Sequence, residues 1–144
     1  MRVVIQRVSK AKVTVERVVV GEIGKGYLVF VGFKFGDTVE EVKRLTGKIV
    51  NLRLMADEKE DINLDLKTVG GEILVVPQFT LYAETSGRRP YFGAAEKPER
   101  AKELFNLFIT ELKNSGLKVE AGKFGGRMSV ELTNDGPVTL ILES

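Results

Sequence analysis

The sequence contains no cysteine and no histidine among its 144 residues. These absences exclude a thiol nucleophile, a Ser-His-Asp triad, a thiolate or imidazole zinc site, and any disulfide bond. An enzyme built from this chain must therefore rely on backbone amides, hydroxyls, carboxylates, lysine or arginine side chains, or a group of the substrate itself. We expect no metal and no other cofactor at its site.

Long apolar runs are also missing. The runs at 27–33 and 73–76 are far below the roughly 18 residues that span a bilayer, and no charged-then-apolar segment opens the chain. These features predict a cytoplasmic protein with no membrane partner. The formal net charge of +2 does not by itself indicate nucleic-acid binding, which depends on local patches of charge.

The composition predicts a single domain over residues 1–144. Hydrophobic residues make up 43% and charged residues 29% of the chain, which is typical of a globular protein with a sizeable core. No linker, low-complexity segment or internal repeat interrupts the sequence.

Apolar residues alternate with polar ones, or form short continuous runs, through much of the chain, which is typical of β-strands. Glycine-containing turns at 24–26 and 32–36 favour tight hairpins between the early strands. The predicted strands contain Val3 and Ile5, Val13 and Val15, Val18 to Ile23, Tyr27 to Phe33, Glu72 to Val76, Lys118 to Ala121, Met128 to Leu132, and Val138 to Leu142.

Two helices are predicted from their end signals. Thr38 and Glu41 have the spacing of a capping box ahead of an apolar face, and a second helix is framed by Pro98 and Gly116. The first apolar face carries Val42, Leu45, Ile49 and Leu52. The predicted fold is therefore α/β, with a mixed, curved, barrel-like sheet covered by two main helices.

Two segments could carry chemistry. Residues 134–139 read Asn-Asp-Gly-Pro-Val-Thr, which on structural grounds is a turn leading into the last strand; only about 5–6% of X-Pro bonds in folded proteins are cis. Residues 77–81 read Pro-Gln-Phe-Thr-Leu and follow an apolar strand, so their backbone amides could line a pocket at the strand end. The alternative is a strand that continues through this segment.

Four segments together resemble the D-aminoacyl-tRNA deacylases in order and spacing, and the resemblance extends over nearly the whole chain. They are 1–8, 71–81, 87–90 and 134–139. The resemblance implies a homodimer with active sites at the subunit interface, in which a cis Gly136-Pro137 bond of one subunit reaches into the site of the other. Its two carbonyls would form a chiral gate that holds a D-amino acid, excludes an L side chain and admits glycine.

The resemblance also implies roles for the earlier segment. Backbone N–H groups around Phe79 and Thr80 become candidates for an oxyanion hole, with Gln78 and Thr80 positioning the substrate. A Thr80 nucleophile would lack a histidine base, so we expect water to attack the ester with help from the neighbouring ribose hydroxyl of the terminal adenosine. The family commonly has serine where this chain has Pro77, which puts a catalytic hydroxyl at that position in doubt.

Further residues are expected to support the site. Arg7 could be an ordinary surface charge, but the resemblance implies that its fork of donors supports the Gly-Pro segment, beside Asn134 and Thr139 as substrate-binding or supporting residues. Arg88 and Arg89 could contact tRNA phosphates, or could simply be solvated.

The sequence therefore predicts an RNA-dependent ester hydrolase whose partner is D-aminoacyl-tRNA. One alternative is a non-catalytic tRNA- or RNA-binding dimer that uses the same adenosine pocket. Another is a structural homodimer whose motifs serve packing alone. Turnover of charged tRNA would indicate the enzyme, affinity without turnover the binding module, and no affinity the structural dimer.

Overall fold

The computed structural model, which describes residues 1–144, is organised around the long strand β1 (Arg2–Val15). This strand pairs antiparallel with three others, and the sheet order is β2-β1-β3-β6-β7 with β8 also paired to β1. β6 and β7 continue the sheet in parallel with β3, so the sheet is mixed as predicted. The partner strands are β2 (Val18–Ile23), β3 (Gly26–Gly32), β6 (Glu72–Pro77), β7 (Lys118–Ala121) and β8 (Ser129–Glu143).

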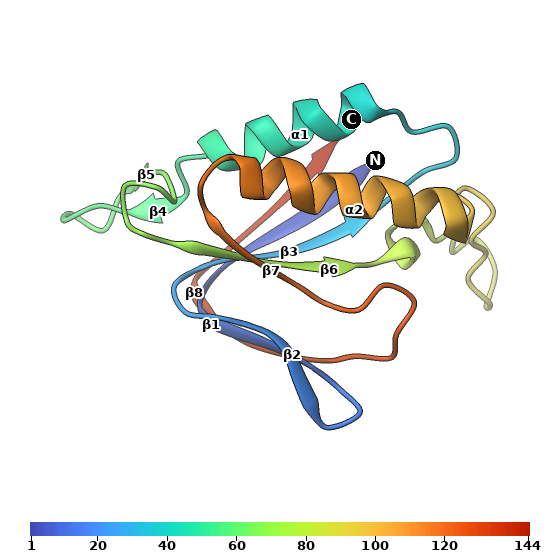
Figure 1. Cartoon of the computed structure of the whole chain (residues 1–144), viewed down its shortest axis with the longest axis horizontal. Coiled ribbons are helices and arrows are strands. Elements are labelled where there is room, and N and C mark those ends of the chain that lie inside the picture. Colours follow the sequence, from blue (N-terminus) through green and yellow to red (C-terminus); the bar gives the residue numbers. More distant parts are fainter.

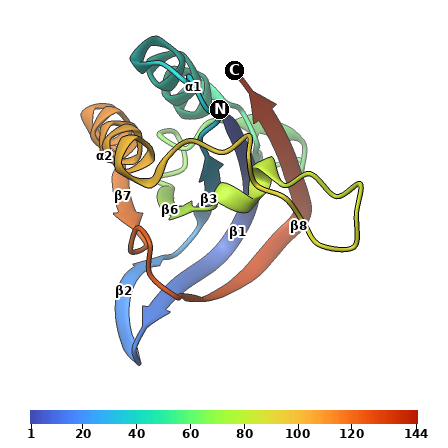
Figure 2. The same ribbon diagram turned by 90° about the vertical axis from the view of Figure 1, so that its right-hand side faces the viewer.

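The sheet curves until its edge strands approach each other, as Figure 2 shows. A Cβ added at Gly21 of β2 would lie only 3.2 Å from the Ala121 carbonyl oxygen of β7. Seven buried apolar residues fill the inside of the curve: Val8, Ala11, Val13, Ile23, Leu28, Leu74 and Val76. The predicted barrel-like sheet is thereby confirmed.

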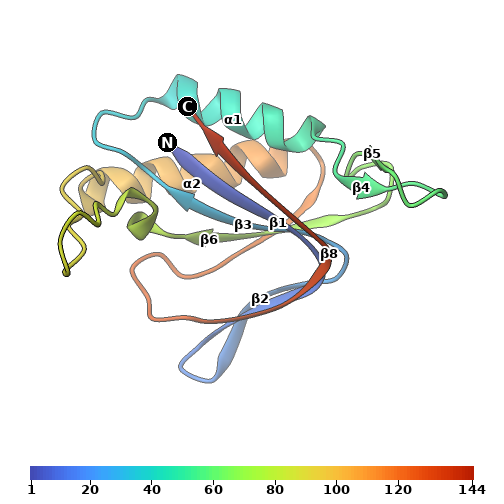
Figure 3. The same cartoon turned by 180° about the vertical axis from the view of Figure 1, so that it is seen from behind.

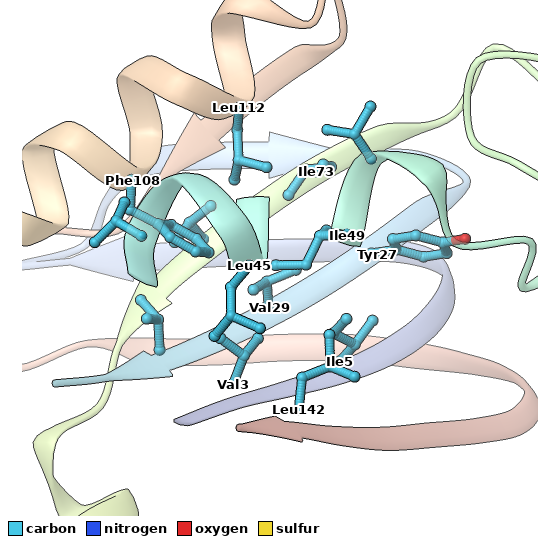
Figure 4. Packing of buried hydrophobic residues seen from close by; sticks show 14 of the residues in the cluster. Val3, Ile5, Tyr27, Val29, Leu45, Ile49, Ile73, Phe108, Leu112 and Leu142 are labelled. Carbon is cyan, nitrogen blue, oxygen red and sulfur yellow. The ribbon is translucent and has the colours of Figure 1, made fainter. Parts of the chain in front are cut away.

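Helices α1 (Val39–Asn51) and α2 (Pro98–Asn114) cover the opposite face of the sheet (Figure 1). The capping box forms as predicted, because Glu41 N–H donates to the Thr38 hydroxyl and Thr38 N–H donates to the Glu41 carboxylate. Side chains of both helices interdigitate with those of the sheet in a cluster of 23 buried residues (Figure 4). Neither helix has the length and apolar character needed to cross a membrane.

The hairpin prediction is wrong in its connectivity. β2 and β3 do not pair with each other, because both pair with β1 from opposite sides. The tight hairpin joins β1 to β2 instead, through Glu16 and Arg17, whose φ angles are 49° and 68°. A second, short hairpin formed by β4 (Met55–Ala56) and β5 (Ile62–Leu64) was not predicted, because its strands are too short to show a periodic pattern.

The separation of the last two predicted strands is also wrong. The chain does not turn at 134–139 but continues through it as β8, a strand of 15 residues. β1 is likewise one strand of 14 residues rather than two short ones. β1 and β8 pair on both sides of this segment, so the chain keeps its direction along β1 although the register shifts within it.

The substitution Gly26→Ala tests whether the close approach of β3 and β6 requires glycine. A Cβ at this position would lie 1.9 Å from the Glu72 carbonyl oxygen, so we expect Gly26→Ala to force the strands apart and lower the free energy of unfolding by about 2–3 kcal/mol. Urea denaturation measures this. Gly24→Ala is the matched control, because a Cβ there meets nothing within 4 Å, and its effect should stay within about 0.5 kcal/mol. Equal effects of the two substitutions would contradict the close-approach explanation.

Candidate active site

A pocket of about 690 Å³ opens at the carboxyl ends of β3 and β6. Ligands commonly bind outside the carboxyl ends of parallel strands, where the backbone leaves the sheet and its polar groups become available. The wall residues come from four parts of the chain: Val31, Gly32 and Phe33; Val76, Pro77, Gln78 and Phe79; Phe92, Ala95, Glu96, Lys97, Pro98 and Ala101; and Phe124, Gly125, Gly126, Met128 and Val130.

The chain leaves β6 at Pro77 and enters the short 3-10 helix η1 (Phe79–Tyr82). Gln78 N–H donates to the Val31 carbonyl at 2.8 Å, and the hydrogen bonds of the turn begin with Leu81 N–H donating to the Gln78 carbonyl at 3.2 Å. The N–H groups of Phe79 and Thr80 precede that first bond and have no partner inside the turn. A strand continuing through this segment is therefore the wrong alternative, and the amides emerge at a strand end as predicted.

Gly32 allows η1 to pack closely against β3. A Cβ at Gly32 would lie 2.7 Å from the Gln78 carbonyl oxygen and 3.2 Å from the Leu81 Cβ. A side chain at Gly32 would push η1, with its backbone amides, away from β3.

Thr80 lies beside the pocket without lining it. Its half-buried hydroxyl accepts a hydrogen bond from Gln78 Nε2. An amide nitrogen that donates its proton cannot take one away, so this contact orients Thr80 but does not activate it as a nucleophile. Of the predicted catalytic residues, Gln78 and Phe79 line the pocket directly.

Arg2 fixes the position of η1, a role that sequence reasoning missed. Its Nη1 donates to the Leu81 carbonyl at 2.7 Å, its Nε pairs with the Glu143 carboxylate, and its guanidinium lies 5.1 Å from the centre of the Tyr82 ring. An arginine at the first position of a strand gives no signal of such a role in the sequence.

Three aromatic side chains, Phe79, Phe92 and Phe124, line the pocket. Phe79 packs edge-on against Phe92 with ring centres 5.1 Å apart, while Phe124 lies 5.6 Å from Phe105 of α2. Sequence reasoning also missed Phe124 and Met128; the available signal was an aromatic and an apolar residue within the glycine-rich segment 122–128.

The other predicted segment bulges out of β8. Thr139 is opposite Gln6 and Asn134 is opposite Val8, so residues 135–138 face Arg7 alone. The Gly136-Pro137 peptide bond is cis, and Gly136 has a φ of +128°. A Cβ at Gly136 would lie 3.0 Å from the Val138 nitrogen and 3.2 Å from Arg7 Nη2, so glycine is needed here for both space and conformation.

Arg7 lies beneath this bulge and is only 7% exposed, so the interpretation as an ordinary surface charge is wrong. Its Nε donates to the Asp135 carbonyl and its Nη1 to the Leu54 carbonyl, both at 2.9 Å. The Asp135 carboxylate lies 3.5 Å from Nε. The neighbouring Tyr27 is buried too, and burial raises the pKa of its hydroxyl to about 12.

Asn134 and Thr139 mark the two ends of the bulge. Asn134 is exposed, and the Thr139 hydroxyl accepts a weak hydrogen bond of 3.4 Å from Gln6 Nε2.

Within one chain, the two predicted segments are not brought together. Arg7 pairs with Tyr27, whereas the pocket begins at the Val31–Pro77 pair, four residues farther along β3, or about 13 Å at the rise of a β-strand. No residue of 134–139 lines the pocket.

Arg88 and Arg89 lie outside the pocket as well. They occupy an exposed loop closed by a pair of backbone hydrogen bonds between Glu84 and Tyr91, at 2.8 and 2.9 Å. In Figure 2 this loop projects to the right of η1, while the connection between β7 and β8 lies to the left.

The only carboxylate in the pocket wall belongs to Glu96. It accepts hydrogen bonds from Gly36 N–H at 3.0 Å and from Lys97 N–H at 2.8 Å, and these contacts hold its pKa below the usual range. No group of three or more carboxylates is arranged to hold a metal ion anywhere in the structure.

Comparison with known sequences places this arrangement in a family. The sequence profile of the family described as D-Tyr-tRNA(Tyr) deacylase matches residues 4–143. The chain belongs to this family. It is 52% identical over 145 residues to the D-aminoacyl-tRNA deacylase of Clostridium botulinum, covering 100% of this chain and 97% of that protein. It is also 52% identical over 145 residues to the D-aminoacyl-tRNA deacylase of Aquifex aeolicus, covering 100% of this chain and 98% of that protein.

Solved structures give the same fold. A protein named c-Myc DNA Unwinding Element Binding Protein superimposes with a TM-score of 0.93 at 38% identity, covering 100% of this chain and 99% of that one. A structure described as a probable eukaryotic D-amino acid tRNA deacylase has a TM-score of 0.85 at 20% identity, covering 98% and 97% of the two chains. The latter likeness concerns the fold alone.

Arg7 tests the link between the bulge and the rest of the sheet. Arg7→Met keeps an apolar stem but leaves the buried Leu54 carbonyl and the Asp135 carbonyl without their donor, so we expect a loss of about 2–3 kcal/mol in the free energy of unfolding. Arg88→Met, at an exposed site without such contacts, is the control and should change stability by less than about 0.5 kcal/mol. Equal denaturation midpoints for wild type and Arg7→Met would show that these bonds do not stabilise the fold.

Proposed function

We propose that this chain is a D-aminoacyl-tRNA deacylase, which hydrolyses the ester joining a D-amino acid to the terminal adenosine of tRNA. The observation that carries the proposal is the pocket at the end of β6, where the Phe79 and Thr80 amides have no partner inside their own turn. Membership of the deacylase family supports the reaction class, and the relatives at 52% identity are named for it.

The reaction needs a group that stabilises negative charge on the ester oxygen. Water attacks the carbonyl carbon and an oxyanion forms. The bond to the ribose oxygen then breaks, and a proton from the attacking water ends on that oxygen, which releases the amino acid and tRNA. The N–H groups of Phe79 and Thr80 would donate to that oxyanion, and one such donor is worth about 3 kcal/mol in acyl transfer.

The substrate itself would assist the attack. The chain has no histidine, and Thr80 is bonded to an amide rather than to a base. In our proposal the neighbouring ribose hydroxyl orients the water, and the aromatic pocket walls hold the adenine so that water, hydroxyl and ester are aligned. Gln78 and Thr80 then act as positioning residues.

A homodimer would bring the two family segments together. The Arg7–Tyr27 pair beside the Gly136-Pro137 bulge lies about 13 Å along β3 from the pocket of its own chain, but the bulge protrudes from a strand that lacks cover. Only Leu142 among the 15 residues of β8 is buried, and Figure 3 shows no element lying over this strand in that view. Exposed Ile141 and Phe79 add apolar surface, at 64% and 58% exposed, that a second copy would cover.

The gate works by exclusion. In the cis arrangement, the Gly136 and Pro137 carbonyls of one subunit would accept hydrogen bonds from the α-ammonium of a D-amino acid held in the other subunit's pocket. With the ammonium and the ester in the same places, the side chain of an L-amino acid would run into backbone. Glycine has no side chain to exclude, so glycyl-tRNA is also a substrate in this proposal. A cytoplasmic location remains a prediction of the same proposal.

The gate predicts strong selectivity between enantiomers. Purified protein should release D-tyrosine from D-tyrosyl-tRNA at least about 100-fold faster than L-tyrosine from L-tyrosyl-tRNA, because one orientation alone fits without collision. The measurement is loss of radiolabelled amino acid from tRNA under single-turnover conditions. Equal rates would contradict the gate, and tRNA binding without any turnover would favour the non-catalytic alternative.

Mixing two inactive variants tests whether the gate acts between subunits. Gly136→Ala spoils the gate, and Ala95→Trp fills the pocket, so each homodimer should be inactive. After the two are unfolded together and refolded at equal amounts, half of the dimers are mixed and one of their two sites is intact, which predicts recovery of about a quarter of the wild-type rate. No recovery, with mixed dimers shown by mass spectrometry, would place gate and pocket in the same chain.

Substitutions of Thr80 distinguish the substrate-assisted mechanism from one in which the Thr80 hydroxyl is the nucleophile. Thr80→Ala should keep kcat within about tenfold of wild type, whereas loss of a true nucleophile typically costs about 10⁴-fold or more. Thr80→Ser is the matched control because it keeps the hydroxyl. An inactive, folded Thr80→Ala protein beside an active Thr80→Ser protein would restore the nucleophile model.

A further inference from the structure

The connection between β7 and β8, residues 122–128, is a well-defined turn at the mouth of the pocket. Gly122 N–H donates to the Val75 carbonyl at 2.8 Å, which ties the connection to β6. Gly126 N–H donates to the Lys123 carbonyl at 3.1 Å, and Gly125 has a φ of +71°, the pattern of a type II turn. The backbone of this connection is therefore held against β6.

The side chains of this connection fall into two sets. Phe124 and Met128 line the pocket, whereas Lys123 and Arg127 are exposed. Neither cation takes part in any of the ion pairs of the chain. An apolar and aromatic wall is thus flanked by two unpaired positive charges.

Basic residues outnumber acidic ones at the pocket mouth, although the chain as a whole is nearly balanced, with 22 basic and 20 acidic residues. Residues 121–130 include no aspartate or glutamate. Exposed Lys97 is a third cation, in the pocket wall itself, and follows Glu96, whose carboxylate is engaged by two backbone amides. The mouth therefore carries a net positive charge.

Positive groups beside aromatic walls are the arrangement that binds single-stranded nucleic acid, since the bases stack and the phosphates meet the cations. We propose that Lys123 and Arg127 bind phosphates of the unpaired 3′ strand of tRNA, directly before the nucleoside that enters the pocket. This inference rests on the proposed function and extends it by naming the surface that receives the RNA backbone. Lys97, in the pocket wall, would add a third contact.

This surface differs from the one that the sequence favoured. Arg88 and Arg89 lie on an exposed loop outside the pocket wall, on the other side of η1 from the β7–β8 connection (Figure 2). In our proposal they are not needed to hold the strand at the pocket.

The test measures equilibrium binding of an RNA hairpin that carries no amino acid and copies a tRNA acceptor stem with its unpaired 3′ end. The comparison is the same hairpin without that 3′ end. The full-length double variant Lys123→Ala/Arg127→Ala should weaken binding of the complete hairpin by about tenfold. The slope of log affinity against log salt should fall by about 1.4, or about 0.7 for each phosphate contact to a single strand. Affinity for the shortened hairpin should not change.

Two variants serve as controls. Lys43→Ala/Arg44→Ala removes one lysine and one arginine that are exposed on α1 and form no ion pair, and it should leave the salt slope unchanged. Lys123→Arg/Arg127→Lys keeps both charges and should bind nearly as wild type. Equal losses in the two alanine double variants, or an equal loss on the shortened hairpin, would overturn the proposed contact.

Deacylation distinguishes failure of this inference from failure of the proposed function. D-tyrosyl-adenosine, which has no phosphate, should be hydrolysed equally by wild type and by Lys123→Ala/Arg127→Ala, while KM for D-tyrosyl-tRNA rises about tenfold in the variant with little change in kcat. An unchanged KM for tRNA overturns the phosphate contact alone. Absence of hydrolysis by the wild type on both substrates overturns the function, and the hairpin titration still decides whether the cations bind RNA.

Discussion

The backbone of β1 hydrogen-bonds to β2, β3 and β8, and the remaining structure depends on these three pairings. β3 pairs with β1 on one side and with β6 on the other, and η1 with its amides follows the end of β6. The register of β1 with β8 shifts opposite Arg7, and the β8 residues left without a pairing partner there form the Gly136-Pro137 bulge. The same strand thus positions both family segments, one at each end of its pairing with β3.

Arg7 makes the slip in register stable. A bulge leaves backbone carbonyls without ladder partners, and a buried carbonyl without a donor is costly. The guanidinium supplies donors to the Asp135 and Leu54 carbonyls from a nearly buried position. Arg2 has the corresponding effect at the other end of the strand, where it donates to the Leu81 carbonyl of η1. Two arginines of one strand therefore orient segments that lie far apart in the chain.

The pocket combines a rigid backbone with adaptable walls. Close approach at Gly32 fixes η1 against β3, while the phenylalanine side chains and Met128 provide apolar surface around it. Such a site suits a reaction in which the substrate carries its own activated ester and its own hydroxyl, because the protein then needs to align groups more than to supply reactive ones. The cations at the pocket mouth extend this alignment to the RNA backbone in our proposal.

Much of the fold was predictable because it follows local patterns: the capping box at Thr38 and Glu41, the frame of the second helix, and the alternation of most strands. The absence of histidine and cysteine also excluded by itself any thiol nucleophile and any imidazole base. Tertiary structure alone decided that 134–139 is a bulge within one strand instead of a turn between two, because β8 pairs with β1 on both sides of it. It alone revealed Arg2, Lys123 and Arg127, since an isolated charge in a sequence carries no signal of what the folded chain places beside it.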